Sequence, residues 1–382
     1  MKRKNIMALI LAGAMCFALL SGCGNKDDGN SASSTEQSSY IRDDGLVYNS
    51  SFSDVNMDIS SISSCIYSGG TYYIMGMTDN TGMDENGNEI YSYDYNIYTM
   101  TDFESGLKKF ENYSELEIPE GMEGSSYTSG MAVTDGKIWT LENQYIYCFD
   151  LPEDFDEEND DEWNYYSSET DIYYLRWFSL NGSDSGEINL NEALGSGSDY
   201  FYISNMLPDS EGNIYLLGED GVYIICTGGQ IKTAAATGEY SWFSGMVALR
   251  DGSIAVTAYG NDGLSLISVS SDGSFGEAKT ISSNAWTIYN GSGDYDFYYS
   301  NNSVLHGVNL GEEKDDTLFN FINCNVDESD MSCIIPMDDG SFIALLSEWS
   351  SGNTKPKFEA ATISLVDASS LPEKTTLTFA SN

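Results

Sequence analysis

The chain has 382 residues, of which 60 are acidic and 16 basic, so its formal net charge at pH 7 is -44. A surface this acidic is repelled by nucleic acid phosphates and by anionic lipid headgroups, which excludes both as binding partners. Hydrophobic residues make up 41% of the chain, enough for a sizeable core.

Residues 1–22 are predicted to be a secretory signal peptide. A basic start, KRK, precedes an apolar run of 15 residues from Ile6 to Leu20, which is shorter than the roughly 20 residues that span a bilayer. The run ends in LSGC at residues 20–23, which resembles the lipobox of bacterial lipoproteins. That resemblance implies cleavage before Cys23, a lipid thioether on its sulfur, and a chain anchored outside the cytoplasmic membrane without spanning it.

The segment after the lipobox is predicted to be a flexible stalk over residues 23–44. No large apolar residue occurs between Gly24 and Ser39, so the segment cannot bury enough surface to offset the entropy cost of ordering. The stalk is expected to separate a folded body, residues 45–371, from the membrane.

The acidic residues show no metal-binding spacing. DENGNE at Asp84–Glu89 is similar to a calcium loop, but with Gly87 as the loop glycine the first ligand position falls on Gly82, so the EF-hand pattern fails. The densest acidic run, Glu153–Glu162, is expected to be a solvated loop between strands. Ca²⁺ is therefore a candidate ligand without a supporting motif, and no cofactor is predicted.

Residues 45–371 read as short alternating runs separated by glycine turns, which indicates an all-β protein. The clearest unit, Met246–Ile281, contains four predicted strands joined by three Asp-Gly hairpins at Gly252, Gly263 and Gly273. Asp-Gly favours type I′ turns, in which both central residues have positive φ. One such four-stranded sheet is too small to bury a core by itself.

The first hairpin of this unit recurs along the chain, at Gly70, Gly136, Gly212, Gly252, Gly293 and Gly340. From Gly212 onward the steps are 40, 41 and 47 residues, and the two longer steps before it contain insertions. A four-stranded unit with a period in the forties predicts a β-propeller of about six blades, with a seventh still allowed by the insertions. The alternative is a two-sheet sandwich, but sandwiches do not repeat internally at this period.

Four aromatic residues are candidate ligand contacts. Tyr127, Tyr202 and Trp242 lie nine to ten residues before the glycine of their repeats, and Trp286 lies seven before its own. This spacing places them at the entry to the innermost strand, on loops that rim one mouth of the channel. Such rings suit stacking on sugars or on peptide side chains, although aromatic residues also cap blade ends.

The sequence contains no recognisable catalytic constellation. The single histidine, His306, lies in a predicted strand, with no second histidine to share a metal and no nucleophile motif nearby. The sequence therefore predicts a non-catalytic, membrane-anchored module that binds a ligand or a protein, and not an enzyme. The alternative is a carbohydrate-active propeller enzyme of the glycoside hydrolase type, which would use a pair of carboxylates.

Five cysteines remain after residues 1–23: Cys65, Cys148, Cys226, Cys324 and Cys333. Their odd number argues against a complete disulfide framework, and most fit apolar strand patterns as small buried residues. Cys324 and Cys333 are one pair that could meet across adjacent strands.

The last residues, PEKTTLTFASN at 372–382, alternate as a strand does. With the lipobox, stalk and Tyr-rich repeats, they make the chain resemble bacterial lipoproteins whose N-terminal propeller-like region precedes the solute-binding domain of an ABC transporter. That resemblance implies a role in sugar or peptide uptake, with the binding domain itself absent here. Alternatively, the tail is the outer strand of the last blade, unless the N-terminal strand at Gly45–Phe52 closes the ring instead.

Overall fold

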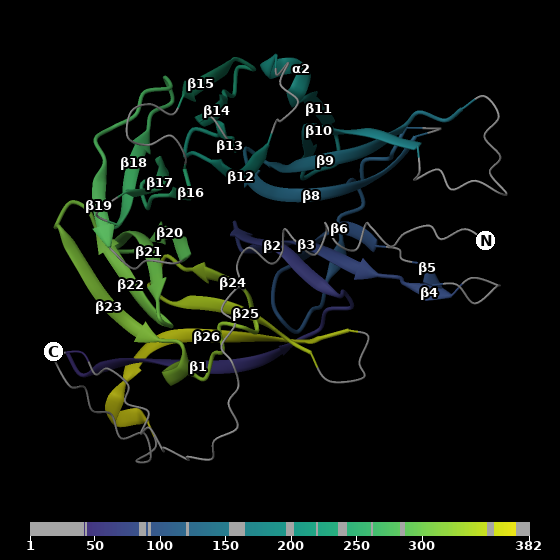
Figure 1. Ribbon diagram of the computed structural model, residues 1–382. Coiled ribbons are helices and arrows are strands. Elements are labelled where there is room, and N and C mark those ends of the chain that lie inside the picture. The colour runs from purple at the N-terminus through teal and green to yellow at the C-terminus, as the bar shows by residue number, and fades with distance from the viewer. Residues whose placement is uncertain are drawn as a thin grey trace, which may run out of the picture.

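The protein is a six-bladed β-propeller, as a computed structural model shows (Figure 1). The structure describes residues 42, 44–83, 89–90, 93–119, 122–152, 165–195, 202–218, 221–235, 243–260, 263–282, 287–349 and 355–371. Six four-stranded antiparallel sheets form the ring, and a two-stranded ribbon is attached to one of them. The predicted fold class is thus confirmed, with six blades.

The blades are numbered in chain order, and each is given from its inner to its outer strand. Blade 1 consists of β2 (Ser61–Ser68), β3 (Thr71–Asp79), β6 (Tyr93–Met100) and β7 (Lys108–Lys109), with the ribbon β4 (Gly82–Met83) and β5 (Glu89–Ile90) between β3 and β6. Blade 2 consists of β8 (Glu123–Thr134), β9 (Lys137–Phe149), β10 (Tyr166–Ser179) and β11 (Ser185–Asn189). Blade 3 consists of β12 (Ile203–Pro208), β13 (Ile214–Gly218), β14 (Gly221–Ile225) and β15 (Ile231–Ala235).

The second half of the ring follows the same order. Blade 4 consists of β16 (Gly245–Ala248), β17 (Ile254–Gly260), β18 (Gly263–Val269) and β19 (Lys279–Ser282). Blade 5 consists of β20 (Thr287–Ser292), β21 (Tyr295–Asn301), β22 (Val304–Asn309) and β23 (Lys314–Asn320). Blade 6 consists of β24 (Met331–Pro336), β25 (Phe342–Glu348), β26 (Lys357–Asp367) and β1 (Leu46–Val55). Short helices are α2 (Leu190–Leu194), η3 (Ile322–Cys324) and η4 (Ala368–Ser370).

The hydrophobic core lies between neighbouring blades. Each inner strand contacts the next around the ring, and β24 contacts β2 where the ring closes. At that closing seam, Ile74 of blade 1 and Leu345 of blade 6 belong to one buried cluster. No helix in the described part of the chain has the length and apolar character needed to cross a bilayer.

The six predicted hairpin glycines all lie in the turn between the first two strands of a blade, and all have positive φ, between 55° and 82°. The type I′ expectation is wrong at Gly252, however, because Asp251 keeps a negative φ. There the Leu249 carbonyl accepts from Gly252 N–H and the Asp251 side chain accepts from Ser253 N–H at 2.9 Å. This is a three-residue loop with a left-handed glycine at its end. Asp135-Gly136 does have two positive φ values.

The N-terminal strand closes the propeller. β1 pairs antiparallel with β26 over its whole length, from Leu46 opposite Asp367 to Val55 opposite Phe358. The outer position of blade 6 is therefore filled by β1. Residues 372–382 lie outside the described residues.

The cysteines do not follow the pairing considered from the sequence. Cys324 ends η3 and is buried, with its Sγ 4.0 Å from the Tyr48 carbonyl oxygen. Cys333 lies on β24, and its thiol raises the pKa of Cys65 on β2, so these two side chains lie close together. A Cys324–Cys333 pair is thus wrong, because η3 directs Cys324 into the core beneath β1.

Candidate functional site

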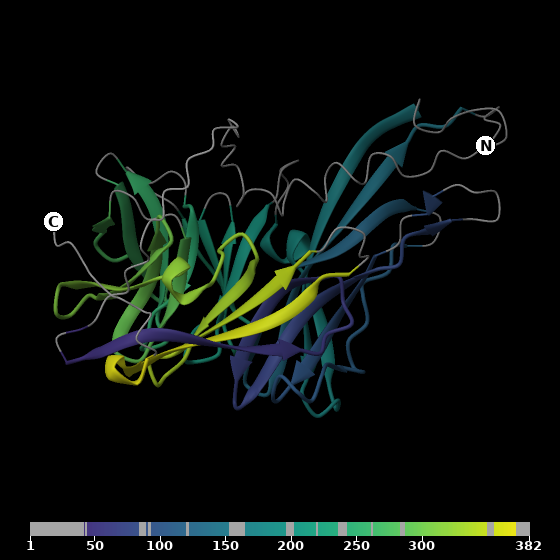
Figure 2. The same ribbon diagram turned by 90° about the horizontal axis from the view of Figure 1, so that it is seen from below.

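The first three strands of blade 2 are the longest in the propeller, with 12 residues in β8, 13 in β9 and 14 in β10. Together with the β4–β5 ribbon of blade 1, they project well beyond the ring on one side (Figure 2). Side chains alternate across a strand, so successive residues of β8, β9 and β10 point to opposite faces of the sheet. One face is directed toward blade 3 and the other toward blade 1. Leu141 packs in the blade 3 interface and Ile138 in the blade 1 interface, which identifies the two faces.

The face toward blade 3 carries a polar group at its base. Asn143 is fully buried, and its Nδ2 donates to the Tyr127 hydroxyl at 2.9 Å and to Asp171 Oδ1 at 3.0 Å. Burial raises the pKa of Asp171, while the hydrogen bond from Asn143 opposes that shift. Burial, then Asp171 and Tyr202, raise the pKa of Tyr127 to about 12, so these side chains lie close together. No donor among the described residues reaches Asn143 Oδ1.

Asn191 of α2 holds the free edge of β10 in this region. β11 pairs with β10 only from Tyr174 onward, so the preceding β10 residues have no strand on that side. The Asn191 side chain accepts from Tyr173 N–H and donates to the Asp171 carbonyl oxygen, both at 2.8 Å. This amide replaces a strand partner and sets the position of Asp171 and Tyr173.

Above this group, aromatic side chains follow one face of the extension. Ring centroids are 5.1 Å apart for Tyr145 and Tyr147, 6.4 Å for Tyr147 and Phe149, and 6.2 Å for Phe149 and Tyr166. The Tyr166 hydroxyl donates to the Glu169 carboxylate at 2.6 Å. Burial, and then Glu169, raise the pKa of Tyr145, so this side chain also lies close to Glu169. We define the aromatic face of blade 2 as Tyr127, Asn143, Tyr145, Tyr147, Phe149, Tyr166, Glu169, Asp171, Tyr173 and Tyr202.

Two of the four sequence-predicted contact residues belong to this face. Tyr202 lies immediately before β12 with 44% of its surface exposed, as expected for the rim. Tyr127 lies within β8 and not on a loop, because β8 begins four residues earlier than the spacing indicates. Trp242, Trp286 and the predicted lipidation site Cys23 lie outside the described residues.

No sequence motif singled out Asn143, Asp171 or the aromatic series along β9. The signal was present as the alternation of Tyr145, Tyr147 and Phe149, but it could not be distinguished from ordinary blade packing. His306, in contrast, is a strand residue as expected. It stacks on Tyr299 at 4.6 Å between ring centroids, and its Nδ1 lies 3.1 Å from Asp315 Oδ1.

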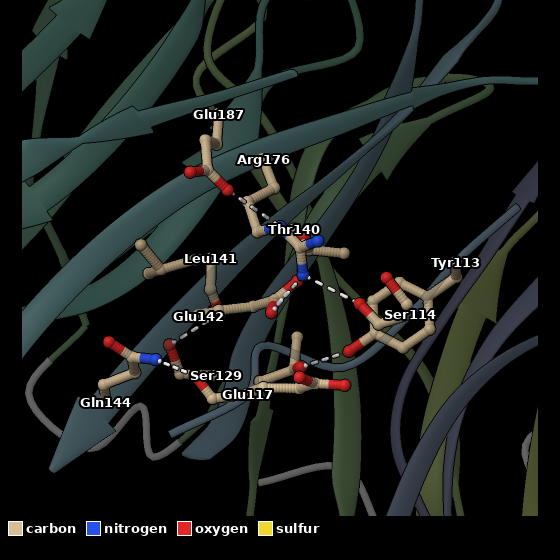
Figure 3. A network of polar contacts seen from close by, with 11 residues as sticks. Tyr113, Ser114, Glu117, Ser129, Thr140, Leu141, Glu142, Gln144, Arg176 and Glu187 are labelled. Carbon is tan, nitrogen blue, oxygen red and sulfur yellow. Dashed lines mark hydrogen bonds and ion pairs between the residues drawn. The ribbon is translucent and has the colours of Figure 1, made fainter. Parts of the chain in front are cut away.

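The opposite face of blade 2 contains a buried ion pair (Figure 3). Arg176 Nη1 lies 2.8 Å from Glu142 Oε2 and also donates to the Ser114 carbonyl at 2.8 Å. Thr140 Oγ1 donates to Glu142 Oε1 at 2.7 Å. Burial raises the pKa of Glu142, and the neighbouring Arg176 is the group that lowers this pKa most strongly. Since both carboxylate oxygens are occupied by protein donors, this pair has a structural role.

Glu115, near this pair, has a strongly shifted pKa. Burial and then the carboxylates of Asp94 and Glu142 raise its pKa to about 7, against a backbone hydrogen bond from Tyr95. An acid whose pKa is raised in the folded state contributes most stability below its unfolded pKa and loses it as pH rises through the folded value. Glu115 therefore destabilises the fold above about pH 5.

We expect Glu115→Gln to increase stability at pH 8 by about 1 kcal/mol, a value reduced for partial solvent exposure, and to leave it nearly unchanged at pH 4.5. Urea unfolding of both proteins at the two pH values measures this difference. Glu111→Gln, at an exposed neighbouring position, is the matched control. Equal effects of Glu115→Gln at both pH values would contradict the assignment.

Other places in the described residues are poorer candidates for the site. A hollow of about 280 Å³ between blades 1 and 2 is lined by Thr71, Lys108 and Phe110, among others, and has no carboxylate or histidine in its wall. The described residues include no group of three or more His, Cys, Asp or Glu side chains placed to hold a metal ion.

Comparisons with known proteins identify only solved structures of low sequence identity. No family model and no curated protein sequence matches the chain. Among solved structures, it is similar to a streptogramin B lyase, with 11% identity over 83% of this chain and 98% of that one and a TM-score of 0.45. It is also similar to virginiamycin B lyase from Staphylococcus aureus (10% identity, 82% and 99% coverage, TM-score 0.46). A third similar structure is that of dipeptidyl peptidase 4 from Porphyromonas gingivalis, with 10% identity over 85% of this chain and 49% of that one and a TM-score of 0.40.

These comparisons correct one prediction. The expectation that the chain is not an enzyme is contradicted, because the similar solved structures are those of lyases and a peptidase. The absence of a catalytic sequence motif was weak evidence against an enzyme. A propeller can assemble a site from residues on different strands and blades, which no short motif joins. At 9–11% identity the likeness concerns the fold alone and indicates no reaction for this chain.

Proposed function

We propose that this chain binds a neutral oligosaccharide on the aromatic face of blade 2. The observation that carries the proposal is the combination of a series of accessible rings with a carboxylate and a buried amide at its base. Tyrosine rings pack against the apolar face of a sugar, while their hydroxyls and Asp171 can bond sugar hydroxyls. Asn143 Oδ1 is a buried acceptor lacking a donor among the described residues, which a ligand hydroxyl or a water satisfies.

Charge supports a neutral ligand over an anionic one. The chain has a formal net charge of -44, and the aromatic face as defined contains two carboxylates and no basic residue. Anionic ligands would be repelled. A basic peptide is the competing ligand, and its binding would depend strongly on salt, whereas sugar stacking would not.

Titration calorimetry with xylo-, cello-, malto- and manno-oligosaccharides tests the proposal. We expect binding of at least one series, weakened about tenfold or more by Tyr202→Ala or Asp171→Asn, since each removes about 1.4 kcal/mol or more of contact energy. Tyr259→Ala is the control, because Tyr259 is also an exposed tyrosine, at 50%, but lies on blade 4. Binding of a basic peptide alone, abolished at 0.5 M NaCl, would contradict the proposal, as would equal affinity for all variants.

A carbohydrate-active enzyme is the second candidate, and Asp171 is the observation that favours it. Glu169 and Asp171 are two residues apart on β10 and share one face, which separates their Cα atoms by about 6.6 Å. Burial raises the pKa of Asp171, as a proton donor to a glycosidic oxygen requires. Shortened products in the same oligosaccharide mixtures, detected by mass spectrometry and lost in Asp171→Asn, would establish this function.

We further propose that the chain acts outside the cell, anchored through Cys23, in association with solute uptake by an ABC transporter. The LSGC sequence supports the anchor and the LTFA sequence near the end supports the transporter association. Cell fractionation checks the location: the chain is expected with membranes, and Cys23→Ser is expected to release it.

A further inference from the structure

Two thiols meet at the seam where the propeller ring closes. Cys65 lies on β2, the inner strand of blade 1, and Cys333 on β24, the inner strand of blade 6. These strands contact each other, and both cysteines pack against the same buried cluster, which includes Ile74 and Leu345. The neighbouring Cys333 thiol, and then burial, raise the pKa of the Cys65 thiol, so the two side chains lie close together.

We propose that Cys65 and Cys333 form a disulfide that covalently closes the propeller between its first and last blades. The two cysteines lie on contacting inner strands and pack against one cluster, and a disulfide between them has an S–S bond length of about 2.05 Å. Without this bond, hydrogen bonds between β1 and β26 and the packing of the seam hold the ring closed. The proposal is independent of the ligand and depends on the proposed extracytoplasmic location only for its oxidant.

The oxidant is an external disulfide, either of a protein thiol–disulfide oxidoreductase or of a small molecule such as oxidised glutathione. The Cys333 thiolate attacks one sulfur of that disulfide and releases the other as a thiol. The Cys65 thiolate then attacks the Cys333 Sγ of this mixed disulfide, the bond from that Sγ to the oxidant's sulfur breaks, and the second half of the oxidant leaves as a thiol. In total, two protein thiols lose two electrons and two protons, and one external disulfide gains them.

The surroundings of Cys65 affect how readily this exchange occurs. The neighbouring Cys333 thiol and burial raise the pKa of the Cys65 thiol well above its usual value. Because the thiolate is the reactive form, oxidation of the folded dithiol is slow at neutral pH and faster at higher pH. Burial also limits the access of external reductants to the finished disulfide, which protects it from reduction.

The bond would constrain nearly the whole propeller. The chain from Cys65 to Cys333 passes through all six blades, and a cross-link that closes a long loop restricts the unfolded chain more than one that closes a short loop. The expected effect is a melting temperature at least about 4 °C higher for the oxidised than for the reduced protein.

Oxidation of the purified full chain with oxidised glutathione at pH 8.5 tests the geometry. Non-reducing proteolysis and mass spectrometry are expected to give a peptide pair linked through Cys65 and Cys333. Reductant is expected to lower the melting temperature of the wild type, but not that of Cys65→Ser or Cys333→Ser. Cys226→Ser, which removes a half-buried cysteine of blade 3, is expected to behave as the wild type does.

Three results would overturn the proposal. The first is full alkylation of both Cys65 and Cys333 after the glutathione treatment. The second is a linked pair whose reduction leaves the melting temperature unchanged. The third is free thiols at both positions in the protein isolated from its own cells under non-reducing conditions. None of these depends on oligosaccharide binding, so they are distinguishable from a failure of the proposed function.

Discussion

Replacing Tyr48 with alanine is expected to lower the free energy of unfolding by about 3–5 kcal/mol. Tyr48 lies on the closing strand β1, has 8% of its surface exposed, and packs against Phe319 and Phe342 with ring centroids 5.0 Å and 6.1 Å away. Removal of the ring leaves a cavity where β1 meets blade 5 and blade 6. Because β1 closes the ring, the loss should affect the unfolding of the whole propeller.

Urea unfolding followed by circular dichroism measures this change. Phe52→Ala is the matched control, because Phe52 lies on the same strand with 40% of its surface exposed, and a change of at most about 1 kcal/mol is expected there. Similar losses for the two variants, or a loss below about 1 kcal/mol for Tyr48→Ala, would show that β1 does not close the ring as described.

Arg176→Leu is expected to destabilise the fold by about 3–5 kcal/mol at pH 8, because it leaves the Glu142 carboxylate buried without its counter-ion. The side chains of Arg176 and Glu142 are 11% and 1% exposed. Burial already raises the pKa of Glu142, and loss of Arg176 raises it further. An acid with a raised folded pKa loses stability as pH rises through that value, so the loss should be smaller at pH 5 than at pH 8.

A double-mutant cycle isolates the interaction. Arg176→Leu combined with Glu142→Gln should be less destabilised than the sum of the two single changes. Arg250→Leu is the matched control, because Arg250 also pairs with a carboxylate, Asp296 at 2.8 Å, but is 36% exposed, so its loss should cost about 1 kcal/mol or less. Additive single changes, or equal losses for Arg176→Leu and Arg250→Leu, would contradict a buried pair.

Much of the architecture is readable in the sequence because it follows from local rules. A glycine at positive φ is needed in the same turn of every blade, so Gly70, Gly136 and their counterparts recur with the period of the repeat. Period-two alternation between those turns defines antiparallel strands, and a repeat in the forties requires neighbouring sheets to bury one another. Fold class, blade composition and the position of the first hairpin in each blade are therefore determined locally.

Tertiary structure alone decides the features that join distant segments. Whether β1 or the tail fills the outer position of blade 6 depends on pairing between Leu46 and Asp367, more than three hundred residues apart, and both candidates had a suitable alternating pattern. Cys65 meets Cys333 only because the ring closes there. The aromatic face arises because blade 2 extends beyond its neighbours, which exposes residues that would otherwise be core. A strand pattern specifies which side chains share a face, but the partner of that face is set by the packing of the complete ring.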